Sequence, residues 1–305
     1  MPIVAEDMLQ TIKDRQWTLG DIDWDAPGAE LITEEQKPKL KAFMADLVWI
    51  ENVGARGFAA LAKKAPDPTL AEIYRYFHAE EQKHANAELA LMRRWGMLAD
   101  DEVPEPNVNI RLAIEWLDTF ADRMSLSVLG TVIPMLEVAL DGALLKFLLE
   151  EVDDPICHAV FRKINADESR HLAVDFYALD MIGSARLRKL LIESVGSVLS
   201  PAVIIGALMY VPLLNKMRDN IVDMGLAEDR LYDAMARFKK NGERGNGKRL
   251  LTYQVLKYHA GWVINRDSPY HYFADAMVRV TDLYPRFLLR PQPTWSKELT
   301  YEPVA

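Results

Sequence analysis

The hydrophobic and polar positions along the chain follow the helical repeat in most segments, and no segment shows the convincing alternation that predicts a β-strand. A kink or break is expected at Pro134, because proline removes a helical hydrogen bond. A short helix is expected near the start of the irregular segment 1–35. The pattern predicts an all-α fold, with helices over residues 36–64, 69–97, 108–151, 156–182, 222–240, 250–265 and 269–286.

Residues 194–215 differ from the other helical segments because they carry no charged side chain. Their length approaches that of a membrane span, which needs about 20 apolar residues. Two prolines, two glycines and three serines interrupt the segment and weaken that interpretation. We therefore expect a buried or dimer-facing helix rather than membrane contact, and a homodimer that uses the apolar surface of residues 198–214.

Glycine, proline and charge divide the chain into three parts. Residues 1–35 contain Pro27 and Gly28 and are expected to form an N-terminal arm. The helices within residues 36–183 are expected to form a central bundle. Residues 184–305 are then a C-terminal helical extension that packs on this bundle.

Composition and charge narrow the chemistry that the chain can perform. Half of the 305 residues are hydrophobic, and the net charge of −9 disfavours nucleic acid as a partner. Cys157 is the only cysteine, which excludes an intramolecular disulfide and a cysteine-rich metal site. A metal site would therefore use histidine and carboxylate ligands, which suit iron, manganese or zinc. The start of the chain shows no secretory signal, so a cytoplasmic location is expected.

An internal repeat is the most informative feature of the sequence. Residues 67–84 (DPTLAEIYRYFHAEEQKH) align without a gap with residues 154–171 (DPICHAVFRKINADESRH), at an offset of 87 positions. Both copies begin with Asp-Pro, in which Asp caps a helix and Pro suits its first position. Both end with acid-Glu-x-base-His, so each predicted helix carries a Glu and a His on one face.

Two further glutamates precede these motifs at nearly equal spacing. Glu51 lies 30 residues before Glu81, and Glu137 lies 31 before Glu168. Both interrupt apolar runs, where an ionised carboxylate is costly unless it is paired or bound to metal. Solvated charges on surface helices are the alternative explanation for the two Glu-x-x-His motifs, but they leave Glu51 and Glu137 unexplained.

Four helices that supply Glu, Glu-x-x-His, Glu and Glu-x-x-His resemble the ferritin-like di-iron carboxylate superfamily. The resemblance covers about residues 40–183 and implies a ferritin-like four-helix bundle with additional C-terminal helices. It implies that Glu81 and Glu168 bridge two metal ions or move between binding modes, and that they are the catalytic ligands. The six implied metal ligands are Glu51 and His84 on one ion, Glu137 and His171 on the other, and Glu81 and Glu168 on both.

The string DESRH at residues 167–171 is also similar to the D-E-x-R-H string of bacterial multicomponent monooxygenase hydroxylases. By that likeness charged neighbours support the ligands, since a ligating histidine usually gives its other N–H to a carboxylate. Asp141, one turn after Glu137, is a pocket acid, a proton relay or a structural ion-pair partner. Asp46 is an alternative first ligand, and His78 has a supporting or surface role. The supporting residues are Glu80, Lys83, Asp167, Arg170 and Asp141.

The resemblance implies an O₂-activating monooxygenase or oxidase with two iron ions as cofactor and O₂ as co-substrate. Manganese, or a mixed manganese–iron pair, would fit the same ligands. The small residues Gly54 and Gly57 leave room beside the site, so we expect a small apolar or aromatic substrate, including an acyl chain. Electrons would come from an external donor protein or from the substrate itself. Apolar lining is expected from Ile133, Met135, Leu136 and Leu140.

Three other functions could use the same ligands. A radical protein like the small subunit of ribonucleotide reductase usually has a tyrosine one turn after its first Glu-x-x-His, where this chain has Glu88. A ferritin-like iron store or ferroxidase does not need the long C-terminal region. A di-manganese protein or a peroxide scavenger stays open. The chain also resembles, more loosely, the p-aminobenzoate N-oxygenase group, but Ile164 stands where that group has a further histidine, which disfavours N-oxygenation.

Overall fold

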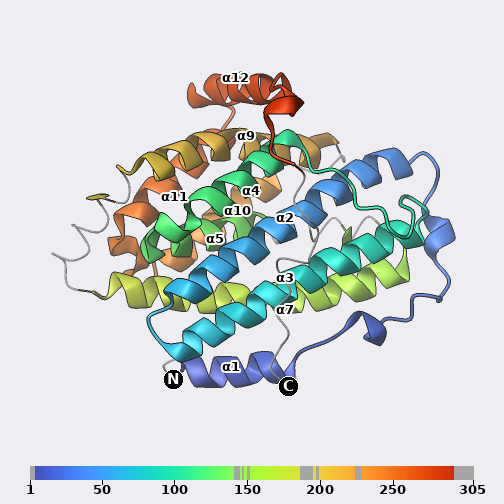
Figure 1. Ribbon diagram of the computed structural model, residues 1–305, viewed down its shortest axis with the longest axis horizontal. Coiled ribbons are helices and arrows are strands. Elements are labelled where there is room, and N and C mark those ends of the chain that lie inside the picture. The colour runs from blue at the N-terminus through green and yellow to red at the C-terminus, as the bar shows by residue number, and fades with distance from the viewer. Residues whose placement is uncertain are drawn as a thin grey trace.

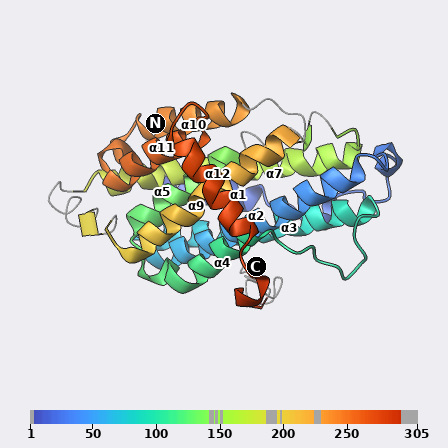
Figure 2. The same ribbon diagram turned by 90° about the horizontal axis from the view of Figure 1, so that it is seen from above.

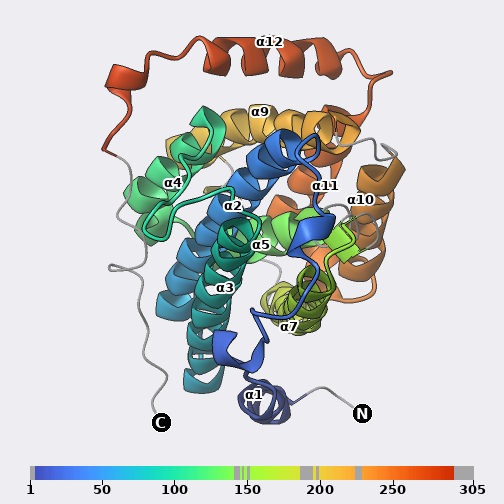
Figure 3. The same cartoon turned by 90° about the vertical axis from the view of Figure 1, so that its right-hand side faces the viewer.

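The computed structural model describes residues 4–140, 145, 148–149, 152–185, 195–196, 199–223 and 229–291. Among these residues every regular element is a helix and no strand is present, so the predicted all-α class is confirmed. None of the described helices is long and apolar enough to cross a membrane. The helices lie in layers, with α1 at one side of the molecule and α12 at the other (Figure 1, Figure 3).

Four helices form the centre of the molecule. α2 packs on α3 and α5, and α7 packs on the same two helices, so each of the four has two of the others as neighbours. This closed arrangement turns one face of every helix toward a common interior. The bounds are α2 Lys37–Lys64, α3 Pro68–Arg94, α5 Leu126–Leu140 and α7 Pro155–Gly183.

The two repeated helices, α3 and α7, begin as the sequence predicts. The Asp67 carboxylate accepts the N–H of Leu70 at 2.9 Å, and the Asp154 carboxylate accepts that of Ile156 at 2.9 Å. Each aspartate satisfies a backbone donor that the first helical turn leaves free. Asp154 also accepts a hydrogen bond from Arg94 at 2.9 Å, which ties the start of α7 to the end of α3.

The prediction of one helix over 108–151 is wrong. The chain forms α4 (Val108–Phe120) and a 3₁₀ turn (Ala121–Arg123) before α5 begins, and α5 then continues through Pro134. The hydroxyl of Ser125 accepts a backbone N–H of the first turn of α5, which starts a new helix at this point. The break therefore comes from a capping residue rather than from the proline.

The C-terminal helices cover α4 and α5. α9 packs on α4, α11 and α12, while α10 and α11 both pack on α5. α12 is the outermost helix and crosses over the molecule when it is seen from above (Figure 2). Residues 292–305 lie outside the part of the chain that the structure describes. The bounds are α9 Pro201–Asp223, α10 Asp229–Gly242, α11 Leu251–Ile264 and α12 Tyr270–Asp282.

The uncharged segment 194–215 contributes the first part of α9 over its described residues. Leu213 and Leu214 are buried, whereas Ile204 and Ile205 are exposed. One side of the helix thus packs inward, and the other presents apolar side chains at the surface. The expected homodimer contact on this surface stays a prediction.

The N-terminal arm lies along the outside of the central helices. Its helix α1 (Ala5–Asp14) packs on α3 and α7 (Figure 1). Further along the arm, the Arg94 guanidinium donates hydrogen bonds to the carbonyls of Trp24 and Ala26 at 2.5 and 2.6 Å. These hydrogen bonds hold the later part of the arm against the C-terminal end of α3.

Candidate metal centre

The six predicted ligands come together in the interior of the four central helices. They form two groups, in each of which one ligand atom per residue lies within 4.8 Å of the others. All six side chains are buried, and α2, α3, α5 and α7 all contribute. The groups are Glu51, Glu81, His84 and Glu168, and Glu81, Glu137, Glu168 and His171.

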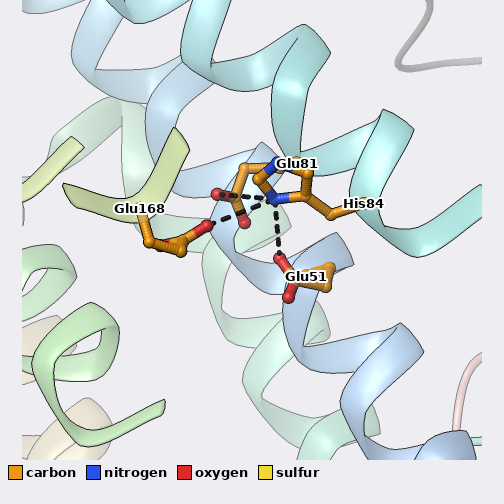
Figure 4. Close-up of side chains that lie close together, drawn as sticks. All are labelled: Glu51, Glu81, His84 and Glu168. Carbon is orange, nitrogen blue, oxygen red and sulfur yellow. Dashed lines mark ion pairs between the residues drawn. The ribbon is translucent and has the colours of Figure 1, made fainter. Parts of the chain in front are cut away.

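His84 is the centre of the first group (Figure 4). Its Nδ1 atom lies 3.2 Å from Glu168 Oε1, 3.6 Å from Glu51 Oε2 and 4.0 Å from Glu81 Oε1. The carboxylates come from three different helices. Since Glu81 and His84 are three residues apart on α3, both point from one face of that helix toward the group.

His171 has the same position in the second group. Its Nδ1 atom lies 3.1 Å from Glu81 Oε1, 3.4 Å from Glu137 Oε2 and 3.6 Å from Glu168 Oε1. Glu81 and Glu168 therefore belong to both groups, while Glu51 and Glu137 each belong to one. The arrangement repeats the approximate two-fold pattern of the sequence.

The ligand atoms at the centre of the cluster fit a bound cation. Buried polar atoms in native proteins nearly always have a hydrogen-bond partner. Here carboxylate oxygens and imidazole nitrogens face one another instead, in the manner of ligands around a metal ion. The buried cluster atoms without a hydrogen-bond partner are Glu81 Oε1, His84 Nδ1, Glu137 Oε2, Glu168 Oε1 and His171 Nδ1.

The crowding of ionisable groups in the cluster shifts the pKa values of its residues. Burial and the neighbouring Glu51 and Glu168 carboxylates raise the pKa of Glu81 well above its ordinary value. Burial and Glu168 do the same to the pKa of Glu137. The pKa of His171 is raised although its burial acts in the opposite direction, because Glu168 and Glu137 favour the imidazolium. Positive charge at the cluster is thus strongly favoured, whether as protons or as metal ions.

The Nε2 atom of each histidine, which points away from the cluster, contacts a carboxylate from the other copy of the repeat. His84 Nε2 lies 3.0 Å from Asp167 Oδ2, and His171 Nε2 lies 2.9 Å from Glu80 Oε2. When Nε2–H donates to the carboxylate, the lone pair of Nδ1 is left for the cluster. The predicted supporting acids Glu80 and Asp167 therefore lie where they can fix both imidazoles.

The two predicted basic residues lie against these acids. Lys83 Nζ is 3.3 Å from Asp167 Oδ2, and the Arg170 guanidinium lies 3.4 Å from Glu80 Oε1. Arg170 also donates a hydrogen bond to Asp167. His84, Lys83 and Arg170 lower the pKa of Asp167 although its burial acts in the opposite direction. Asp167 thus stays ionised beside His84.

Two residues of the N-terminal arm that no sequence pattern predicts complete this support. Gln16 Nε2 donates to Glu80 Oε1 at 2.6 Å, and Trp17 Nε1 donates to Asp167 Oδ2 at 2.7 Å. The Trp17 ring also stacks on the His84 imidazole, with 6.3 Å between centroids. These contacts join residues that are far apart in the sequence, so no local pattern could reveal them.

A second pair of acids extends the repeat beyond the histidines. Glu88 lies one turn after His84, and Asp175 lies one turn after His171, at the same offset of 87 positions. Both side chains are buried, and their carboxylate oxygens have no hydrogen-bond partner. Burial and the Glu51 carboxylate raise the pKa of Glu88, and burial raises the pKa of Asp175 to about 8. Neither residue is among the predicted ligands or supporting residues, although both keep the offset of the repeat.

The remaining candidates stand apart from the cluster. His78 is buried, but its Nδ1 lies 2.8 Å from the carbonyl oxygen of Ala55, and it belongs to neither ligand group. Asp46 likewise belongs to neither group. Asp141 lies outside the residues that the structure describes.

Comparisons with known proteins add no name to this site. No family model matches the chain, and searches of curated proteins and of solved structures find no similar protein. The geometry of the buried side chains alone indicates a site that could hold metal.

Proposed function

We propose that the chain is a ferritin-like, O₂-activating non-heme di-iron oxygenase or oxidase that acts on a small apolar or aromatic molecule. The observation that carries the proposal is the pair of ligand groups that share Glu81 and Glu168. A carboxylate that belongs to two groups can bridge two metal ions. One Glu and one His are then left for each ion.

Charge and ligand type both agree with two divalent ions. With the glutamates ionised and the histidines neutral, the six ligands carry four negative charges, which two divalent ions neutralise. Oxygen and imidazole ligands without sulfur suit iron or manganese. When bound, two such redox-active ions would support the activation of O₂, with electrons that an external donor or the substrate replaces.

The protein's own residues prepare the site for this chemistry. Asp167 and Glu80 lie where they can orient the two imidazoles, and Lys83 and Arg170 form ion pairs with these acids. The mutual packing of α2, α3, α5 and α7 supports the proposed ferritin-like bundle. The raised pKa of Asp175 makes its carboxyl a proton donor close to the cluster near neutral pH.

Anaerobic loading of the metal-free chain with Fe(II) tests the proposal. We expect about two irons per chain, as in other di-iron bundles, with a Mössbauer spectrum of a coupled pair after exposure to O₂. Consumption of O₂ with a reductant and small apolar molecules would then identify the reaction. Iron below one equivalent, or a preference for inert zinc, would overturn the proposal.

A pair of variants on α3 controls this experiment. Glu81→Ala removes a ligand shared by both groups, so paired iron binding should be lost while the helical circular-dichroism spectrum is kept. Glu72→Ala removes a partly exposed acid of the same helix as Glu81, where Glu72 pairs with Lys13 of α1, and iron binding should be unchanged. Full iron occupancy in Glu81→Ala would show that the ligand set is wrong.

A further inference from the structure

An apolar cavity of about 150 Å³ lies between α4, α5, α9 and α11. Its wall includes Trp116 of α4, Val132 of α5, Val203 of α9 and Leu256 of α11. Among the residues that the structure describes, no charged side chain lines it, and none of the six ligands does. The C-terminal helices α9 and α11 thus help to form a compartment that the four central helices do not form alone.

A second cavity of about 20 Å³ lies between this compartment and the metal centre. It is lined by Glu137 and by Gly54, at which an added Cβ would lie only 2.2 Å from Glu81 Oε2. The two cavities are neighbours because they share wall residues. The shared residues are Val53, Ile133, Leu136 and Leu213.

The expected apolar lining is confirmed in part. Ile133 and Leu136 line both cavities, as predicted. Met135 is buried and lines neither of these two cavities, so its expected role stays a prediction. The side chain of Leu140 lies outside the description. Gly57 leaves room for Ile133, since a Cβ there would lie 2.2 Å from Ile133 Cδ1.

The few polar side chains in the larger cavity already have partners. Thr131 donates to the carbonyl of Ser127 at 2.6 Å, and Thr252 donates to the same carbonyl at 3.1 Å. His259 lies 2.9 Å from the hydroxyl of Tyr270, and burial lowers its pKa, so it is neutral. The wall therefore offers hydrocarbon contacts and no cation for an anionic ligand.

We propose, on the basis of the proposed function, that the larger cavity holds the hydrocarbon body of the substrate while its reacting end lies in the smaller cavity beside Glu137. A cavity of about 150 Å³ in an engineered protein binds benzene, so the body has the size of one aromatic ring or a short alkyl chain. The smaller cavity exceeds the roughly 10–15 Å³ that one water molecule needs, so it admits only a small group. The ligand class is thus a small neutral hydrocarbon, not an aromatic acid.

The route to the surface also follows from the lining. Ala207 of α9 and Val255 of α11 line the larger cavity and are exposed, which places its mouth between these two helices. A larger side chain at Ala207 would cover this mouth without entering the protein core. The position therefore offers a test of access that spares the fold.

Binding of toluene to the full-length chain, kept free of O₂ with and without Fe(II), tests the proposal. Ligand-observed NMR should show saturable toluene binding, with benzoate weaker by at least about tenfold because its charge has no partner. Ala113→Phe places a ring in the cavity from α4 and should weaken toluene binding by about tenfold or more. Ala236→Phe, on the exposed side of α10, is the matched control and should bind toluene as the wild type does.

The outcomes separate this proposal from the di-iron function. If Ala113→Phe fails to fold, Ala207→Trp at the exposed mouth should still weaken or slow toluene binding. No saturable binding to the wild type, or equal binding in all variants, would overturn the cavity proposal. Toluene binding without paired iron would retain the cavity and reject the di-iron function. Paired iron without toluene binding would do the opposite.

Discussion

The two halves of the metal centre repeat the same ligands in different surroundings. In the first half, the His84 ring stacks on Trp17 of the N-terminal arm. In the second half, the His171 ring contacts Phe58 and Phe77, with 5.2 and 4.1 Å between centroids. The smaller cavity touches Glu137 of the second half, while Glu51 of the first half lines neither described cavity.

This difference separates what the repeat determines from what the rest of the chain adds. The repeated helices α3 and α7 place Glu-x-x-His motifs at matching positions, so the ligands are symmetric. The arm and the C-terminal helices are not repeated. Of the two histidine rings, Trp17 of the arm stacks on His84, and of the two unshared glutamates, Glu137 lines the smaller cavity beside the C-terminal helices. In our proposal the arm positions His84, whereas the C-terminal helices form the substrate side beside Glu137.

The largest expected effect distinguishes the shared ligands from the unshared ones. Glu51→Ala and Glu137→Ala each remove a ligand from one group only, so each should lower iron content to about one per chain. Affinity at the altered position should fall by more than about 100-fold, beyond the loss seen for supporting residues. Iron analysis after dialysis measures this. Two tightly held irons in either variant would contradict the division into halves.

The second prediction compares how much the capping residues of α3 and α7 contribute to the stability of the protein. Asp154 is fully buried and binds Arg94 and Trp95, at 2.9 and 2.8 Å, in addition to capping α7. Asp154→Ala leaves the Arg94 charge without its carboxylate, so we expect a loss of about 3–5 kcal/mol. Asp67 is partly exposed, and Asp67→Ala should cost about 1 kcal/mol as the loss of a cap. Urea unfolding followed by circular dichroism measures both, and equal losses would contradict the comparison.

The sequence predicts the symmetric part of the molecule better than the asymmetric part. Asp-Pro starts and Glu-x-x-His spacings are local signals, so α3, α7 and four of the six clustered residues follow from them. Glu51 and Glu137 follow from their spacing to these motifs and from the apolar runs that they interrupt. Trp17 lies 150 residues from Asp167 along the chain, and such a contact depends on the packed fold. Pro134 is the stronger local signal for a break, but α5 continues through it and a single hydroxyl, that of Ser125, caps the start of this helix. The buried pair Glu88 and Asp175 could have been found, since it keeps the offset of the repeat.

The raised pKa values of Asp175 and Glu88 predict how the stability of the metal-free protein depends on pH. Burial raises the pKa of Asp175 from its ordinary value of 3.8 to about 8, so the folded chain binds a proton that the unfolded chain releases. Asp175 therefore makes its full contribution to the free energy of unfolding below pH 3.8, and this contribution is lost as pH rises through about 8. The raised pKa values of Glu88, Glu81 and His171 act in the same direction. The metal-free chain should therefore be less stable at higher pH.

Substitutions of Asp175 and Glu88 test whether these two residues cause the pH dependence. Asp175→Asn removes the charge that must be buried, so at high pH the metal-free variant should gain on the order of 2 kcal/mol over the wild type, with a flatter pH profile. Glu88→Gln should flatten the profile in the same direction. Urea midpoints measured across this pH range give the result. A stability that increases with pH in the metal-free wild type would contradict the raised pKa values.

The smallest expected effect concerns Trp17 of the N-terminal arm, which contacts His84 and Asp167 in the first half of the centre. Trp17→Phe keeps an aromatic ring beside His84 but removes the N–H donated to Asp167, which should cost about 1 kcal/mol and weaken one iron position by about tenfold. Gln16 is exposed, so Gln16→Ala should change iron binding less, although it loses a bond to Glu80. Trp24→Phe is the matched control. Its indole donates to the carbonyl of Leu19, at 2.8 Å, and to no supporting acid, so stability should fall without a change in iron binding. If Trp17→Phe and Trp24→Phe retain iron equally well, the arm only covers the bundle and does not position His84.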